Sequence, residues 1–104
     1  MAQFDVYLNL STETRDSIPF LLDVQADMLD MLATRIVVPL IVADEMAQAA
    51  KFLNPQFKIK GITVVMSTAE LAGVPNRSLG EKVTSLKNKR DEIIAALDLL
   101  FTGI

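Results

Sequence analysis

The sequence predicts a mainly β domain that ends in one long α-helix, most simply a small antiparallel barrel or sheet with the helix packed against it. Several short apolar segments of strand character precede one long segment of helical periodicity. A chain of 104 residues suits a single domain spanning 1–104. With 51% hydrophobic and 22% charged residues it can form both a core and a wetted surface, so disorder is not expected.

The first strand is predicted from a strict alternation of apolar and polar side chains over Gln3–Asn9. This period of two places Phe4, Val6 and Leu8 on the inward face. The wholly polar segment Ser11–Ser17 then predicts a hairpin loop.

Two further strands are expected over Pro19–Gln25 and Arg35–Leu40, which are rich in Leu, Val and Ile. Between them, Ala26–Leu32 is bounded by acids yet carries four apolar side chains, Met28, Leu29, Met31 and Leu32. It is either a helical turn or a loop tip. At a tip these side chains would need a partner, because contiguous exposed apolar patches usually mark interfaces.

In the second half, Ala43–Phe52 has helix formers and predicts a short helix. Gly61 predicts a hairpin turn between strands Gln56–Lys60 and Ile62–Ser67. Ala69–Gly80 contains two glycines and a proline and is expected to be mostly turn and irregular chain.

The clearest periodicity predicts a helix over about Ser85–Phe101, with Ser85 as its N-cap. Apolar or long side chains recur there every three or four residues, at Leu86, Arg90, Ile93, Leu97, Leu100 or Phe101, and Ile104. The basic run Lys82–Arg90 also holds Glu81 and Asp91 at its ends. It is interpreted as a solvated helix face, with a nucleic-acid patch as the alternative.

Composition narrows the function classes. The chain has no cysteine and no histidine, which removes disulfides, thiol nucleophiles, imidazole bases and the commonest metal ligands. A net charge of −3 argues against direct nucleic-acid binding. No apolar window is long enough to span a membrane and no signal peptide is visible, so we expect a cytoplasmic protein without a cofactor.

The C-terminal segment Leu99–Ile104 is unusually apolar. Leaving Phe101 or Ile104 in water forfeits roughly 1.5–3 kcal/mol each relative to burial. Either this end packs into the protein's own core or a dimer seam, or it projects to dock on another protein. Gly103 frees the backbone to turn just before the last side chain.

Four stretches together resemble the CcdB family of toxins. Phe20–Asp30 is similar to the family pattern F-V-D-V-Q-S-D-I-I-D, and Arg35–Leu40 to R-M-V-I-P-L. Met1–Tyr7 resembles the opening M-Q-F-x-V-Y with one extra residue, and Ile93–Ile104 resembles a helix ending in F-W-G-I. Each motif is weak alone, but four in order over 104 residues are fairly specific.

The resemblance implies an SH3-like barrel with a C-terminal helix, as in CcdB, MazF and Kid toxins, and a homodimer. It implies a non-catalytic plasmid-maintenance toxin that binds the DNA gyrase A subunit, poisons this topoisomerase on cut DNA, and is neutralised by a CcdA-like antitoxin. The implied gyrase-binding residues are Met28, Leu29, Asp98, Phe101, Thr102, Gly103 and Ile104. Gln3, Phe4 and Tyr7 would support that surface. Phe4 is also open to a core role, and Phe101 to a role in the helix seam.

The chain departs from the family at three of these positions. Thr102 stands where the pattern has Trp, so stacking on a target arginine, worth ~0.5–2 kcal/mol, is lost. Ala26 replaces a Ser, and Asp98 replaces an Asn and adds negative charge.

Two other functions stay open. One is an endoribonuclease on the same fold, using Arg35, Thr34 or Asp23 on one surface. The other is a relic that binds antitoxin but no longer poisons gyrase. A carboxylate metal site from Asp23, Asp27 and Asp30 is considered, but a loop with solvated acids is preferred because no supporting ligands accompany them.

Overall fold

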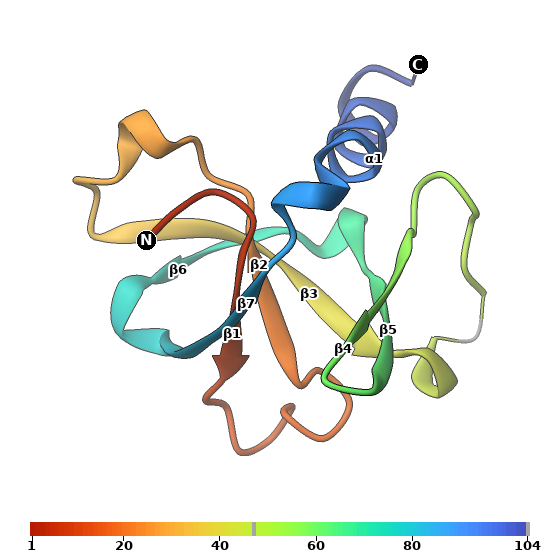
Figure 1. Ribbon diagram of the computed structural model, residues 1–104, viewed down its shortest axis with the longest axis horizontal. Coiled ribbons are helices and arrows are strands. Elements are labelled where there is room, and N and C mark those ends of the chain that lie inside the picture. Colours follow the sequence, from red (N-terminus) through yellow and green to blue (C-terminus); the bar gives the residue numbers. More distant parts are fainter. Residues whose placement is uncertain (47, 104) are drawn as a thin grey trace.

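The computed structural model describes residues 1–46 and 48–103; Ile104 therefore lies outside the described residues. One antiparallel sheet curls into a half-barrel, and a helix packs at one end of it (Figure 1). The seven strands of the described chain are β1 (Asp5–Asn9), β2 (Phe20–Asp23), β3 (Thr34–Val42), β4 (Gln56–Ile59), β5 (Ile62–Met66), β6 (Ala72–Pro75) and β7 (Leu79–Ser85). The predicted fold class is confirmed.

The strands follow the order β4-β5-β3-β2-β1-β7, and β6 also pairs with β3. β3 pairs with three other strands of the sheet, β2, β5 and β6. Its Val37–Leu40 section pairs with β2 on one side. On the other side, Thr34–Val37 pairs with β6 and Leu40–Val42 with β5, so two strands share one edge.

The single α-helix of the described residues, α1 (Arg90–Thr102), follows β7 and a 3-10 turn, η5 (Lys87–Lys89). It buries Ile93 and Ala96 against the sheet and points its C-terminus away from the strands (Figure 1). The predicted helix is confirmed, but Ser85 is not its N-cap. Ser85 is the last residue of β7, five residues before α1 begins, and its hydroxyl oxygen accepts a hydrogen bond from the Lys87 amide at the start of η5 at 3.3 Å.

The main core lies between the concave face of the sheet and α1. It contains Phe4, Val6, Phe20, Leu22, Val38, Leu40, Phe57, Ile59, Val64, Met66, Leu86, Ile93 and Ala96. A smaller cluster of Tyr7, Leu21, Val37 and Leu79 covers part of the opposite face. Both faces of β1 are therefore partly buried.

This second cluster corrects one expectation for β1. Phe4 and Val6 are buried as predicted, but Leu8 is exposed and Tyr7 is buried. Along β2 the alternation is kept, because Val6 lies opposite Leu22 and Leu8 opposite Phe20, but Leu8 is exposed on that face. The pairing of β1 with β7 shifts register between Val6 and Tyr7 and again between Tyr7 and Asn9.

The β4–β5 hairpin turns at Lys60 and Gly61, both with positive φ, as the sequence predicts. Two other predictions are wrong. The described part of Ala43–Phe52 contains one 3-10 turn, η2 (Ala43–Glu45), and no α-helix. Ala69–Gly80 is not mostly irregular, since it contains β6 and the start of β7.

Lys82 lies in β7, so the basic run is not one helix face. None of the helices within residues 1–46 and 48–103 combines the length and apolar character needed to cross a bilayer.

Candidate functional site

The segment between β2 and β3 forms an exposed tip around a 3-10 turn, η1 (Asp27–Leu29). Met28 and Met31 are 79% and 78% exposed, and Leu29 and Leu32 are each 44% exposed. Of the two alternatives left open for this segment, the structure shows elements of both: an exposed tip whose centre is one 3-10 turn. Such a cluster of exposed apolar side chains is atypical of a surface that faces only water.

The tip is held in place by hydrogen bonds to Gln25, which follows β2, and to Gln3 of the N-terminal segment. Gln25, buried at the end of β2, donates from Nε2 to the Leu29 carbonyl at 3.0 Å and accepts from the Ile36 amide at 3.1 Å. The backbone amide of Gln3 donates to Asp27 Oδ1 at 2.7 Å. Gln3 thus contacts the tip directly, through its backbone.

A buried ion pair lies beneath the tip. Arg35 and Asp23 are both fully buried, and Arg35 donates from Nε to Asp23 Oδ2 at 2.9 Å, with Nη2 at 2.6 Å from the same oxygen. Arg35 Nη1 reaches out to Asp30 Oδ1 at 2.9 Å. Burial raises the pKa of Asp23, while its bonds to Arg35 and the Gln25 amide oppose that rise.

This pairing corrects the residue set considered for an endoribonuclease. Of that set only Thr34 is exposed, because Arg35 and Asp23 lie under the surface and bind each other. Asp23 and Asp30 both bind Arg35 rather than converging with Asp27 on a cation. No cluster of three metal-ligating side chains occurs among the described residues.

The C-terminal part of α1 carries the second exposed region. Phe101 is 69% exposed, and Asp98, Thr102 and Gly103 are exposed too. The Thr102 hydroxyl donates to the Asp98 carbonyl at 2.7 Å, so it is bound to its own helix. Gly103 ends the helix in the left-handed region, with φ at 76° and its amide donating to the Leu99 carbonyl.

The tip and the helix meet at an apolar groove of about 350 Å³. Leu29 lines it from the tip and Phe101 from α1, which joins two residues far apart in the sequence. Met28, Asp98, Thr102 and Gly103 do not line this groove. The other lining residues are Val24, Gln25, Ala26, Leu32, Thr34, Ile36, Leu71 and Leu97.

We name the exposed apolar residues of this region the tip-and-tail surface: Met28, Leu29, Met31, Leu32, Ile36 and Phe101. Sequence reasoning missed the role of Ile36. It lies on β3 between buried Arg35 and Val37 and points outward at 37% exposure. The period of two along a strand could have shown this, because it places Ile36 on the face opposite to Arg35 and Val37.

Phe4 and Tyr7, expected to support the surface, are both buried and act only from inside the fold. The Phe4 ring lies 5.8 Å from the Arg90 guanidinium at the start of α1. The Tyr7 hydroxyl donates to Asp5 Oδ2 at 3.3 Å. Burial, then the Asp5 and Asp23 carboxylates, raises the pKa of Tyr7 to about 12.

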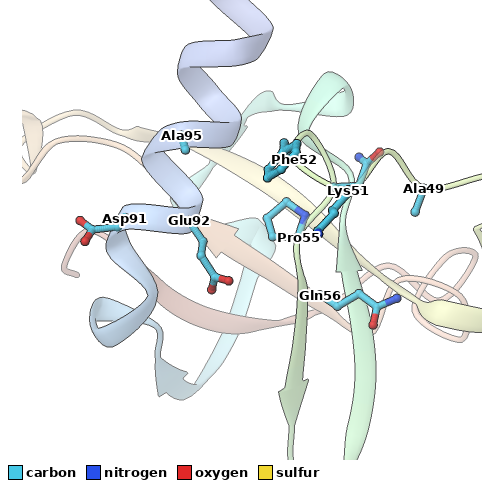
Figure 2. A pocket seen from close by; sticks show the side chains of 9 residues that line it. Ala49, Lys51, Phe52, Pro55, Gln56, Asp91, Glu92 and Ala95 are labelled. Atoms are coloured by element: carbon cyan, nitrogen blue, oxygen red, sulfur yellow. The ribbon is translucent and has the colours of Figure 1, made fainter. Parts of the chain in front are cut away.

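A larger hollow, about 680 Å³, lies elsewhere, between α1 and the segment before β4. Figure 2 shows Phe52 and Pro55 facing the first turns of the helix, which present Glu92 and Ala95. Its lining includes Lys51, Asp91 and Glu92 but no hydroxyl side chain. With no cysteine or histidine in the chain and no hydroxyl side chain in its lining, this hollow offers neither a thiol or hydroxyl nucleophile nor an imidazole base.

Comparisons with known proteins agree with this geometry. The family model described as CcdB protein matches residues 3–103. Among solved structures, the chain is similar to an endoribonuclease in complex with its cognate antitoxin from mycobacterial species. The TM-score is 0.70 at 14% identity, covering 94% of this chain and 91% of that one.

Proposed function

The chain belongs to the CcdB family of toxin–antitoxin toxins, and from this premise we propose that it is a non-catalytic poison of DNA gyrase. In the proposal, two copies form a homodimer whose paired tails enter the gap of the gyrase A subunit and hold the enzyme on cut DNA. A cognate CcdA-like antitoxin wraps the toxin and removes it. The single observation that carries the proposal is the groove shared by Leu29 and Phe101.

The tip-and-tail surface supports a protein–protein function in preference to catalysis. Its side chains are apolar and exposed, whereas two of the three residues considered for catalysis, Asp23 and Arg35, are buried and paired. Burying one such apolar side chain at an interface contributes about 1.5–3 kcal/mol. A surface of this kind binds a partner without bond-making chemistry.

The gyrase test uses a matched pair of phenylalanines. Phe101 is 69% exposed on the tip-and-tail surface, and Phe52 is 72% exposed beside the larger hollow. Purified protein is expected to increase gyrase-dependent linearisation of plasmid DNA. Phe101→Ala and deletion of 102–104 should abolish that effect, and Phe52→Ala should leave it intact. A truncated protein as potent as the full chain would refute the docking model.

The homodimer is tested with a second matched pair. Ile36 on β3 and Ile62 on β5 are 37% and 39% exposed, but only Ile36 lies on the tip-and-tail surface. In the proposal the part of this surface at Ile36 packs on the second copy, and the part at Phe101 stays free for gyrase. Ile36→Lys then shifts the protein to monomer in analytical ultracentrifugation, while Ile62→Lys does not. Equal masses for both variants would place the dimer contact on another surface.

An endoribonuclease is the second candidate, because the similar solved structure is one. Against it stand the absence of histidine and the burial of Arg35 and Asp23. Incubating the protein with messenger RNA separates the candidates. Site-specific cuts that survive Phe101→Ala would favour the enzyme.

A relic is the third candidate, because Thr102 lacks an aromatic ring and its hydroxyl is bound to the helix. Growth of bacterial cells after induced expression of the protein distinguishes a relic from an active gyrase poison. If Thr102→Trp turns a harmless protein into a lethal one, the chain is a relic that still binds antitoxin.

A further inference from the structure

Among the described residues, β4, β6 and β7 each have one unpaired edge, and a seam lies between β4 and β7, the two strands at the ends of the pairing order. β4 pairs only with β5 and β7 pairs only with β1, so each has one free edge. A groove of about 310 Å³ runs between these strands, both labelled in Figure 1. It is lined by 57–60 on one side and by 83–86 on the other, with Asn88 and Lys89 at one end.

Backbone groups on both sides of the seam are directed away from their own partner strands. The two-residue turn makes Ile59 and Ile62 a hydrogen-bonded pair, so the alternate residue Lys58 directs its N–H and C=O to the free edge of β4. On the other side, the Leu86 amide donates to the Phe4 carbonyl at 2.8 Å. The backbone of its neighbour Ser85 therefore faces away from β1.

The groove is positively charged although the chain carries −3. Lys58, Lys60 and Lys89 line it from β4, the hairpin turn and η5, and its lining contains no acid. Within the described residues, none of these three lysines has a carboxylate within ion-pair distance. All three are exposed, so their charge is available to a ligand.

We propose that this seam binds an extended acidic peptide segment as an added β-strand. A peptide supplies amide donors and carbonyl acceptors for the two free edges and carboxylates for the lysines. A nucleic acid satisfies the lysines but has no backbone amides to pair with a strand. Lysines on edge strands also protect against self-association, but here lysines from three elements converge on one groove.

The seam is separate from the tip-and-tail surface. Lys89 precedes the first turn of α1 and Phe101 lies in its last turn, so about 18 Å of helix separates their backbones. A peptide in the seam therefore leaves the surface around Phe101 open. The inference does not depend on gyrase binding.

The test uses the full chain and a fluorescent peptide of about eight residues alternating valine and glutamate, the length of an ordinary strand. Binding is followed by anisotropy, and amide chemical shifts of Lys58 and Ser85 are expected to move. Charge reversal by Lys58→Glu with Lys60→Glu should weaken binding about tenfold or more. Lys51→Glu, an exposed lysine outside the seam, should change it less than about twofold.

Two further probes distinguish strand addition from a simple charge patch. The N-methylated form of the peptide keeps every carboxylate but cannot donate amides, and it should lose binding. If it binds as well as the parent, or a single-stranded oligonucleotide of equal charge competes fully, the proposal is overturned. It also fails if no peptide binds while Lys58→Thr with Lys60→Thr self-associates, since the lysines would then only protect the edges.

Discussion

The buried Asp23–Arg35 pair makes a quantitative prediction about stability. Arg35→Met removes a cation that is fully buried and leaves Asp23 without its charge partner. Breaking such a pair from one side costs about 3–5 kcal/mol, because an uncompensated charge stays in the interior. Since small domains are stable by only ~5–15 kcal/mol, Arg35→Met is expected to remove about a fifth or more of the stability.

The double variant Asp23→Asn, Arg35→Met separates the burial of charge from the loss of contacts. Asparagine keeps a side-chain oxygen for the Gln25 amide, which donates to Asp23 Oδ1 at 3.0 Å. Because no net charge remains inside, the double variant should recover at least half of the loss. Asp30 is 53% exposed and adds little once Arg35 is gone, because water solvates it.

The loss in free energy of unfolding caused by Arg35→Met should also depend on pH. Burial already raises the pKa of Asp23 above its ordinary 3.8, and losing the Arg35 cation raises it further. For a carboxyl with a raised folded-state pKa, the neutral form is favoured in the fold. Its stabilising contribution is complete below 3.8 and is lost as pH rises through the folded-state pKa. The gap between variant and parent should therefore narrow as the solution is acidified.

Urea unfolding followed by far-ultraviolet circular dichroism measures these free energies, at one protein concentration for all variants. The reasoning is refuted if Arg35→Met costs less than about 1 kcal/mol, the value of an exposed pair. It is also refuted if the double variant is no more stable than the single one.

Three other predictions concern Tyr7 and the glycines. Tyr7 is the only tyrosine, so tyrosinate absorbance should give one midpoint, at about 12 in the folded protein and 10.0 after unfolding. The stability that this raised pKa contributes is complete below 10.0 and is lost as pH rises towards 12; a folded midpoint near 10 would mean a solvated ring. Gly61→Ala should cost roughly 1–2 kcal/mol in urea unfolding because φ is +80°, whereas Gly73→Ala, whose Cβ makes an ordinary 3.5 Å contact, should stay within about 0.5 kcal/mol. In Gly80→Ala the new Cβ would meet the Leu8 backbone oxygen at 2.9 Å; a loss of about 1–3 kcal/mol is expected, and a neutral result would contradict this packing.

Local patterns in the sequence were sufficient where one face of an element meets the core and the other meets water. The hairpin at Gly61 and the helix that buries Ile93 are of this kind. Leu8 was predicted to be buried but is exposed, and Tyr7 is buried because a second cluster covers the other face of β1. The residue pattern of β1 alone does not indicate that this cluster exists.

β6 and β7 were missed because their strand character comes from their partners. β6 contains glycine and proline, and β7 contains Glu81 and Lys82, all poor strand formers. Pairing with β3 and β1 overrides these preferences. Conversely, Ala43–Phe52 has helix formers, but an isolated helix of this length is marginal in water.

For the candidate site, sequence reasoning found the exposed tip and Phe101 but not how they meet. That Leu29 and Phe101 line one groove depends on the packing of α1 against the sheet. That Leu29, Phe101 or any other of the expected gyrase-binding residues contacts a partner stays a prediction.

β5 and β6 pair with different halves of β3, so the sheet has two segments, named here the β5 arm and the β6 arm. Each arm can lose its pairing with β3 while the other keeps it. The β6 arm continues to Asn76, whose amide donates to the Ala33 carbonyl and whose side chain donates to the Leu32 carbonyl. Opening that arm would release the base of the tip while the Leu40–Val42 pairing with β5 stays closed. The loop that presents Leu29 thus has a local stability of its own, which substitutions in β6 can lower without melting the rest of the molecule.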